Sequence, residues 1–263
     1  MDDPIICRTC GTNYAHQPNS CPICLDPRQF VPATGQAWDK ASAIAQRHKV
    51  TFTQLSDTLT ELTHTPEYAI GQRAILVETP QGNILWDCLA HFDAPALAEI
   101  EARGGLHAIA ISHPHFFGAV TSLSAHVNAP AYIHAADAHW LQRQGPRITF
   151  WSGPSLKLWE GASLHQCGGH FEGSNVLHLD HGNGILLTGD TVAVGADRTS
   201  ISAMRSYPNR LPLGPTAIQA IQKAMAPLRF DALYSATSGA NIPTGAKEIV
   251  TTSLTRYLES ITT

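Results

Sequence analysis

Four cysteines near the N-terminus constrain the fold of this chain more than any other feature. They form two C-x2-C pairs separated by ten residues, with Cys7 and Cys10 in the first pair and Cys21 and Cys24 in the second. Two-residue spacing turns both sulfurs of a pair toward one ion, and two pairs supply the four thiolates of a tetrahedral site. A segment of about 24 residues is too short to bury a core, so metal binding has to supply its folding free energy.

This pattern predicts a zinc-ribbon-like segment with its linker over residues 1–35, followed by one domain over residues 36–263. Zinc is the expected metal, and its role is structural because the protein fills all four coordination positions. Rubredoxin-type iron uses the same ligand set, and two disulfides would use the same cysteines. A ribbon of this kind also offers a surface for a protein partner.

The start of the chain favours a metal over disulfides. The first residues, Met-Asp-Asp-Pro, lack the basic and apolar regions of a secretory signal, which predicts a cytoplasmic location. Disulfides are rare in that reducing compartment. No apolar run approaches the roughly 18 residues of a membrane span, so we expect no membrane association. A formal net charge of −4 argues against a nucleic-acid partner, because phosphate contacts need a basic surface.

The rest of the chain alternates strand and helix patterns. Residues 36–62 carry apolar side chains at helical spacing and are expected to be mostly helical. From residue 68 onward, strands pair as hairpins in places and alternate with helices in others, which indicates a layered α/β fold with mixed sheets. The expected strands are 68–70, 73–77, 84–86, 108–112, 131–134, 156–159, 163–167, 176–180, 185–188 and 232–235, and the expected helices are 94–103, 115–127, 135–142, 215–226 and 244–262.

Histidines and one aspartate follow three of these strands. His113 and His115 come directly after the strand over 108–112. Residues i and i+2 of an extended backbone face the same way, so both imidazoles can reach one ion. His170 lies in a glycine-rich turn after another strand, and Asp190 ends the segment Leu-Leu-Thr-Gly-Asp.

Together these segments resemble the metallo-β-lactamase fold family over about residues 68–240. The resemblance implies an αβ/βα four-layer sandwich with a metal site at one edge, between the sheets. It implies that His113, His115 and His170 are metal ligands and that Asp190 is the metal-binding carboxylate. The His-Pro-His-Phe-Phe motif and the N-terminal ribbon indicate a divergent subgroup.

The chain departs from the family pattern at three positions. Phe117 stands where the family has the aspartate of its motif, and Gly118 stands where it has the next histidine. The late histidine is also missing, since residues 235–239 read Ser-Ala-Thr-Ser-Gly. The ligands of a second metal are therefore absent. Three histidines and one aspartate predict a single ion, which is zinc or another divalent metal.

A mononuclear site of three imidazoles with an open position predicts a hydrolase that activates water. Asp190 is either a fourth ligand or the group that takes a proton from the water. His134 and Asp87 are the other candidate proton acceptors. Alternatively, His134 packs at a strand end, and Asp87, which resembles an early strand-end aspartate of the family, anchors the metal loop by hydrogen bonds.

Phe116 and Phe117 predict an apolar mouth for this pocket, and Arg205 and Tyr207 in a later loop are expected to line it. An apolar mouth suits an uncharged small-molecule substrate, namely an ester, lactone or amide. The alternative function is non-catalytic: a metal-binding, sensor or interaction protein on a degenerate metallo-β-lactamase fold. A depleted metal set and an added ribbon suit such a module.

Overall fold

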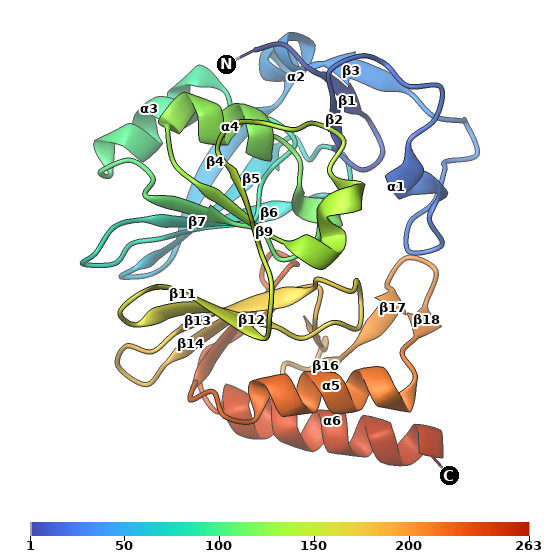
Figure 1. The fold of residues 1–263 in the computed structure, drawn as a ribbon, viewed down its shortest axis with the longest axis vertical. Coiled ribbons are helices and arrows are strands. Elements are labelled where there is room, and N and C mark those ends of the chain that lie inside the picture. Colours follow the sequence, from blue (N-terminus) through green and yellow to red (C-terminus); the bar gives the residue numbers. More distant parts are fainter. Residues whose placement is uncertain (1, 263) are drawn as a thin grey trace. The chain divides into compact units, whose positions relative to one another are not determined.

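The computed structural model describes residues 2–262, which fold as two compact units (Figure 1). The first unit comprises residues 2–133 and 138–150, and the second comprises residues 134–137 and 151–262. The boundary predicted at residue 35 stays a prediction. Within the described residues, every helix falls short of the length and apolar character that a membrane span requires.

The large sheet of the first unit has seven strands. β4 to β7 pair antiparallel, whereas β7, β8 and β9 pair parallel. The central strands β6, β7 and β8 are buried along their whole length and form the core of this unit. In spatial order the strands are β10 (Ile148–Trp151), β9 (Ala131–His134), β8 (Ala108–Ala110), β7 (Ile84–Trp86), β6 (Arg73–Val77), β5 (Leu59–Thr65) and β4 (Lys49–Ser56).

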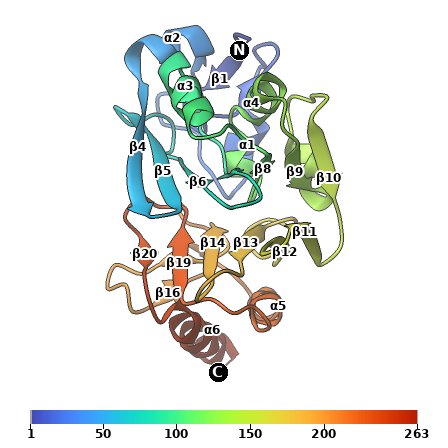
Figure 2. The same cartoon turned by 90° about the vertical axis from the view of Figure 1, so that its left-hand side faces the viewer.

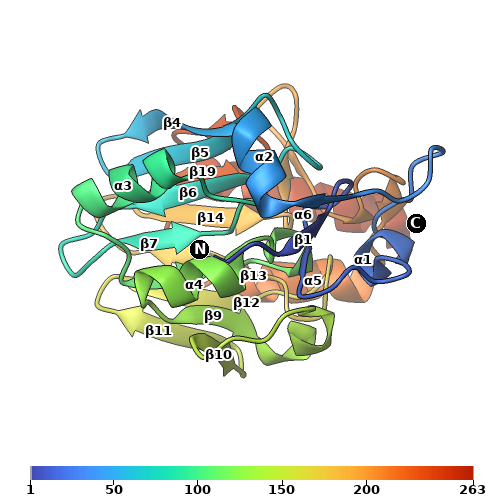
Figure 3. The same ribbon diagram turned by 90° about the horizontal axis from the view of Figure 1, so that it is seen from above.

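Helices of the first unit lie along this sheet, with α3 and α4 on the same face (Figure 3). The Asp93 side chain caps α3 by accepting a hydrogen bond from the backbone N–H of Ala96. The loops after β8 and β9 each contain a 3-10 turn, and these two loops carry several of the predicted site residues. The helices are α2 (Ala41–Arg47), α3 (Ala94–Ala102) and α4 (Val120–Val127), and the 3-10 turns are Pro114–Phe116 and Ala135–Trp140.

A separate three-stranded sheet carries the N-terminal cysteines. Cys7 ends β1, and the turn that follows it contains Cys10 and leads into β2. Cys21 precedes the one-turn helix α1, which contains Cys24, so each C-x2-C pair occupies one tight turn. In spatial order the strands are β2 (Asn13–Tyr14), β1 (Ile5–Cys7) and β3 (Trp38–Lys40), and α1 is Pro22–Leu25.

The second unit has a six-stranded sheet in which β14 and β19 pair parallel and the other neighbours pair antiparallel. Helices α5 (Pro215–Met225) and α6 (Ala246–Thr262) pack on each other and against this sheet (Figure 2). Ile218 and Val250 of these helices meet Leu186 and Leu233 of the strands in the core. In spatial order the strands are β11 (Ser155–Trp159), β12 (Ala162–Gln166), β13 (Asn175–Leu179), β14 (Ile185–Gly189), β19 (Ala232–Ser235) and β20 (Asn241–Ile242).

Two short ribbons complete the second unit. They matter for the site because they follow Asp190 along the chain, and because β17 presents a backbone carbonyl used below. The ribbons pair β15 (Ala193–Val194) with β16 (Ile201–Ser202), and β17 (Met204–Ser206) with β18 (Leu211–Pro212).

The helix predicted over residues 36–62 is wrong for most of its length. Helix α2 covers residues 41–47, whereas residues 49–56 and 59–65 form the antiparallel hairpin β4–β5. The apolar side chains at helical spacing all lie before residue 46. The stretch that follows, Val-Thr-Phe-Thr, is rich in β-branched and aromatic side chains, which favour a strand.

Three smaller predictions also need correction. Residues 68–70 form a turn rather than a strand. The helix predicted over 115–127 is interrupted at Gly118, whose φ of 35° separates a 3-10 turn from α4. The helix predicted over 135–142 is a 3-10 turn that ends at residue 140. The remaining predicted strands and helices are confirmed to within two residues at each end.

Candidate metal centres

The four cysteines of the N-terminal turns, which we call the cysteine knuckle, converge on one point. Their Sγ atoms all lie within 4.8 Å of one another, with Cys7 and Cys24 3.6 Å apart and Cys10 and Cys21 3.5 Å apart. A tetrahedron with bonds of about 2.3 Å separates its sulfurs by about 3.8 Å, whereas a disulfide needs about 2.05 Å. The thiols are buried and form no disulfide. The knuckle therefore fits one metal ion, and the disulfide alternative is wrong.

Hydroxyl groups complete the knuckle. The Tyr14 hydroxyl donates to the Cys21 sulfur at 3.0 Å, and Thr12 Oγ1 lies 3.1 Å from the Cys10 sulfur. Hydrogen bonds from the neighbouring thiols, Cys10 first, hold the pKa of Cys21 well below its usual range, while burial raises the pKa of Cys10. The Tyr14 ring packs edge-on against Trp38 at a centroid distance of 5.4 Å. A thiolate enclosed in this way is stabilised by a bound cation and is closed to substrate.

In the first unit, His113 and His115 flank Pro114 directly after β8. Both imidazoles are buried, and their ring centroids are 5.0 Å apart. Ser112 Oγ lies 2.8 Å from His113 Nδ1 and donates to the Asp87 carboxylate at 2.9 Å. The same carboxylate accepts the Ser112 backbone N–H at 2.7 Å. Asp87 therefore fixes Ser112, and Ser112 fixes the His113 ring.

These contacts also fix the proton on the His113 ring. A carboxylate only accepts hydrogen bonds, so the Ser112 hydroxyl hydrogen points to Asp87 and the Ser112 oxygen accepts the Nδ1–H of His113. Nε2 then carries the lone pair, which is the tautomer that coordination of a metal through Nε2 requires. Asp87 adopts a φ of 66°, a left-handed conformation that costs a non-glycine residue free energy and is typical of functional positions.

In the second unit, His170 lies in the turn between β12 and β13, and Asp190 directly follows β14. His170 Nδ1 lies 3.0 Å from the Met204 carbonyl oxygen, which can only accept, so Nδ1 carries the proton. Nε2 of His170 is therefore the lone-pair atom, and it lies 3.8 Å from Asp190 Oδ2. Two electron-rich atoms at this distance fit coordination of a shared cation.

Two of the three positions at which the resemblance places missing second-metal ligands, Phe117 and Gly118, lie in the first unit. Phe117 is buried, and the neighbouring Phe116 ring packs edge-on at 5.1 Å from the His113 ring. A Cβ on Gly118 would lie 2.3 Å from the Leu89 carbonyl oxygen. Because that contact is with backbone, a histidine at position 118 does not fit unless the loop moves.

Arg205 lies in β17 of the second unit, and Tyr207 directly follows this strand. The Tyr207 ring lies 5.7 Å from the His170 ring, and its hydroxyl donates to the Asp190 carbonyl oxygen at 3.2 Å. Burial, with a further contribution from the Asp190 charge, raises the pKa of Tyr207, so the phenol stays neutral. Arg205 is exposed. The role of these residues and the two phenylalanines in lining a substrate pocket stays a prediction.

His134 packs edge-on against Trp151 at a centroid distance of 4.5 Å. Its Nε2 lies 3.4 Å from the Gly153 carbonyl oxygen, and its Nδ1 accepts the backbone N–H of Ala136 at 3.3 Å. Burial lowers the pKa of this ring. These contacts suit a packed strand-end histidine, and a role as proton acceptor stays a prediction.

Three residues that contact the candidate ligands, Ser112, Tyr14 and Gln72, were not predicted from the sequence. Ser112 immediately precedes His113, so its place at a strand end was an available signal. Tyr14 and Gln72 gave no such signal. Gln72 contacts Cys10 from 62 residues away, a contact that the fold alone creates.

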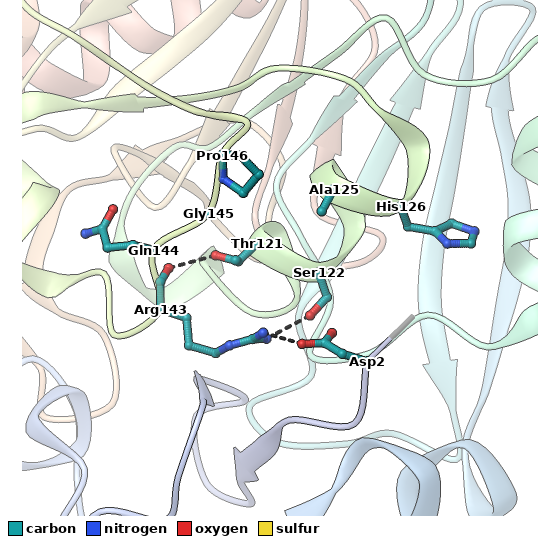
Figure 4. A pocket seen from close by; sticks show the side chains of 9 residues that line it. All are labelled: Asp2, Thr121, Ser122, Ala125, His126, Arg143, Gln144, Gly145 and Pro146. Atoms are coloured by element: carbon teal, nitrogen blue, oxygen red, sulfur yellow. Dashed lines mark hydrogen bonds and ion pairs between the residues drawn. The ribbon is translucent and has the colours of Figure 1, made fainter.

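A cavity of about 390 Å³ lies elsewhere in the first unit (Figure 4). The Arg143 guanidinium points toward Ser122 and Asp2, donating to Ser122 Oγ at 2.8 Å and pairing with the Asp2 carboxylate. Its charge is therefore already neutralised, and the lining contains none of the predicted ligands. The lining residues are Asp2, Thr121, Ser122, Ala125, His126, Arg143, Gln144, Gly145 and Pro146.

Comparison with known proteins agrees with the α/β fold described above. The chain is 38% identical to a Bacillus subtilis (strain 168) protein described as uncharacterized protein YmaE, over 97% of this chain and 96% of that protein. The solved structure of VMB-1 aligns with a TM-score of 0.60 at 16% identity, over 81% of this chain and 98% of that one. The mono-zinc form of the metallo-β-lactamase FIM-1 from Pseudomonas aeruginosa aligns with a TM-score of 0.57 at 17% identity, over 80% and 96%.

These structural likenesses confirm the predicted fold class, an α/β fold of the metallo-β-lactamase type preceded by a cysteine knuckle. The family model described as metallo-beta-lactamase superfamily matches residues 69–235, which is more than half of the chain. The chain therefore belongs to the metallo-β-lactamase superfamily.

Proposed function

We propose that this protein is a metal-dependent hydrolase with one divalent ion at its active site. Three histidines and one aspartate hold the ion: His113, His115, His170 and Asp190. The observation that carries the proposal is the orientation of two histidine rings, since hydrogen bonds place the proton of His113 and of His170 on Nδ1 and leave Nε2 as the coordinating atom.

A single ion is the expected stoichiometry of this centre. Phe117 has no coordinating atom, and Gly118 lacks room for the side chain that a second ion would need. Three imidazoles and one carboxylate suit zinc and other divalent metals. Such an ion supplies Lewis acidity that lowers the pKa of water to about 7.

The contribution of the chain itself is orientation and proton transfer. Ser112 holds the His113 ring, and the Met204 carbonyl holds the His170 ring. Asp190, whose side chain is 22% exposed, is proposed either to accept the proton of water or to complete the ligand set. Asp87 already accepts two hydrogen bonds from Ser112, which favours an anchoring role for it over proton transfer.

We propose an uncharged small molecule, an ester, lactone or amide, as the substrate. The support is the apolar character of Phe116 and Phe117 next to the candidate ligands. The cysteine knuckle is proposed to hold structural zinc, with rubredoxin-type iron as the alternative that metal analysis decides. A cytoplasmic location and the lack of a nucleic-acid partner stay predictions.

Metal content and hydrolysis test this function together. Protein purified without chelator should contain two metal ions per chain, one in the knuckle and one at the histidines. Inductively coupled plasma mass spectrometry measures this content. His113→Ala and His170→Ala should each lose one ion and reduce hydrolysis of a panel of aryl esters and lactones at least about a thousandfold. His181→Ala, at an exposed position, is the matched control and should keep both ions and full activity.

Hydrolysis by both ligand variants at the wild-type rate would overturn the proposal.

The non-catalytic alternative is favoured by one observation. Three apolar side chains of the N-terminal segment are exposed: Leu25 to 60%, Phe30 to 42% and Val31 to 39%. Exposed apolar side chains grouped in this way suit a protein partner. Under this alternative, the histidine centre binds an ion and the wild type hydrolyses no member of the panel.

A further inference from the structure

The cysteine knuckle is joined to the backbone that carries His115 by one buried side chain. Gln72 lies directly before β6, and its Nε2 donates to the Cys10 carbonyl oxygen at 2.7 Å and to the His115 carbonyl oxygen at 3.1 Å. Gln72 is 62 residues from Cys10 and 43 from His115. Both contacts lie within the first unit.

An amide group suits this position because it carries two N–H bonds on one nitrogen. Each N–H serves one carbonyl, so a single atom satisfies two buried backbone acceptors. Gln72 is only 3% exposed. A Cβ on Gly11 would lie 3.0 Å from Gln72 Nε2, so the turn after Cys10 is packed closely on the amide. A shift of the knuckle turn therefore has to move Gln72.

A second side chain, Asn13, joins the knuckle turn to residues 89–90. Asn13 Nδ2 donates to the Ala90 carbonyl oxygen at 3.1 Å, and also to the carbonyl of Gly11 at 3.0 Å. The neighbouring Leu89 carbonyl accepts the backbone N–H of Ala119 at 2.9 Å. We call residues 113–119 the histidine loop. The knuckle turn thus supports this loop directly through Gln72 and indirectly through residues 89–90.

We propose that Gln72 is a positioning residue that couples the cysteine knuckle to the histidine loop, so that metal binding by the four thiolates orders the backbone that presents His115. A metal held by Cys7 and Cys10 fixes the turn between them and with it the Cys10 carbonyl. Gln72 transmits that constraint to the His115 carbonyl. The catalytic meaning of this coupling rests on the proposed function, whereas the coupling itself does not.

Hydrogen–deuterium exchange of the full-length protein tests the coupling. The probe is one equivalent of Cd²⁺ added to metal-free protein, because this soft ion prefers thiolates, and thiolate absorption reports its binding. In the wild type, we expect exchange in the histidine loop to slow about tenfold when Cd²⁺ binds, the equivalent of one or two buried hydrogen bonds. An absence of protection in the wild type overturns the proposal without any variant.

Two variants assign the effect to Gln72. Gln72→Met keeps the side-chain length and removes both donors, so Cd²⁺ should slow exchange less than about twofold. Gln36→Met is the matched control, since Gln36 Oε1 accepts the Cys21 backbone N–H at 2.8 Å and so contacts the knuckle through its other cysteine pair. This control should keep the tenfold effect. Equal protection in Gln72→Met and the wild type contradicts the proposal.

A third variant covers the case in which Gln72→Met no longer binds Cd²⁺. Gln72→Lys restores N–H donors toward both carbonyls and should recover at least about threefold protection. Cd²⁺ binding to Gln72→Lys without protection of the loop overturns the role of Gln72. Because the readout needs neither hydrolysis nor an ion at the histidines, failure of the coupling and failure of the proposed hydrolase give separate results.

Discussion

The cysteine knuckle and the histidine loop both present metal ligands, yet they depend on the rest of the chain in opposite ways. All four thiols come from residues 7–24, and two tight turns orient them. The His113 ring is oriented instead by Ser112, which is held by Asp87 from 25 residues earlier. Removal of the knuckle metal should therefore unfold the knuckle and loosen the backbone at His115, whereas the contact of the His113 ring with Ser112 should remain.

The physical reason is the source of the folding free energy. A segment as short as the knuckle has too little apolar surface to stay folded alone, so the ion provides most of its stability. The histidine loop follows a buried strand of a seven-stranded sheet, and hydrogen bonds preset its ligand tautomer. The predictions for Cys10, Gly118 and Asp87 below test this contrast; a fourth, for His64, concerns acid stability, and all four are given in order of decreasing effect.

Loss of one thiolate from the cysteine knuckle should lower the folding stability of that segment more than any other change lowers stability or affinity. Structural zinc sites in isolated fingers contribute on the order of 10 kcal/mol, and Cys10→Ser should lose most of that. We expect one metal ion fewer per chain and rapid tryptic cleavage after Arg8 and Arg28. Cys167→Ser is the control, because burial raises the pKa of that thiol to about 12 and it lies in the core of the second unit. A trypsin-resistant Cys10→Ser protein would contradict the contrast.

Restoring the family histidine should damage the fold rather than add a metal. Gly118→His should lower the free energy of unfolding by about 3 kcal/mol, because the new Cβ meets the Leu89 carbonyl oxygen. Gly118→Ala should lose a similar amount, since the clash begins at Cβ. Denaturant unfolding and metal content measure both. A stable Gly118→His protein that binds an additional ion would show that the loop can hold two metals.

Acid should destabilise the protein through a buried histidine that is not a predicted ligand. Burial lowers the pKa of His64 to about 4, whereas in the unfolded chain it is about 6.5. The unfolded state therefore binds more protons between these values. The contribution of the neutral, buried His64 side chain to the free energy of unfolding is fully present above about pH 6.5. It is lost as the pH falls to about 4, which lowers the free energy of unfolding by at most about 3 kcal/mol.

Unfolding measured across this pH range checks the contribution of His64. His64→Gln keeps a donor for the His91 carbonyl oxygen, which His64 Nε2 contacts at 3.0 Å. This variant should lose most of the pH dependence in that window. Burial also lowers the pKa of His91, so a smaller slope of the same sign should remain. An unchanged slope in His64→Gln would assign the acid sensitivity to other groups.

The smallest effect is expected for a change at Asp87, because it contacts the His113 ring only through Ser112. Asp87→Asn tolerates the φ of 66° but no longer offers a carboxylate to Ser112. Metal affinity at the histidines should fall 10- to 100-fold, with little change in fold stability. Competition with a chelator measures the affinity, and the knuckle metal serves as the internal control. An unchanged affinity would contradict the orientation of His113 through Ser112.

The parts of the fold that sequence predicted well are those with local signals. The strand over 108–110 and the glycine-rich turn at His170 follow from short apolar runs and glycines. The hairpin over residues 49–65 was missed, because helical spacing before residue 46 was extended too far along the chain. The break at Gly118 was also missed, since a glycine inside a helical pattern does not reveal a positive φ.

By itself, the sequence determined the candidate ligands and the closed character of the cysteine knuckle, because spacing within a turn or at a strand end is short-range geometry. Only the tertiary structure decided the tautomers of His113 and His170, the lack of room at Gly118, and the bridge from Cys10 to His115 through Gln72. Except for the Ser112–His113 contact, each of these depends on segments distant in sequence, which are brought within hydrogen-bond or van der Waals distance by the packing of the sheets and loops.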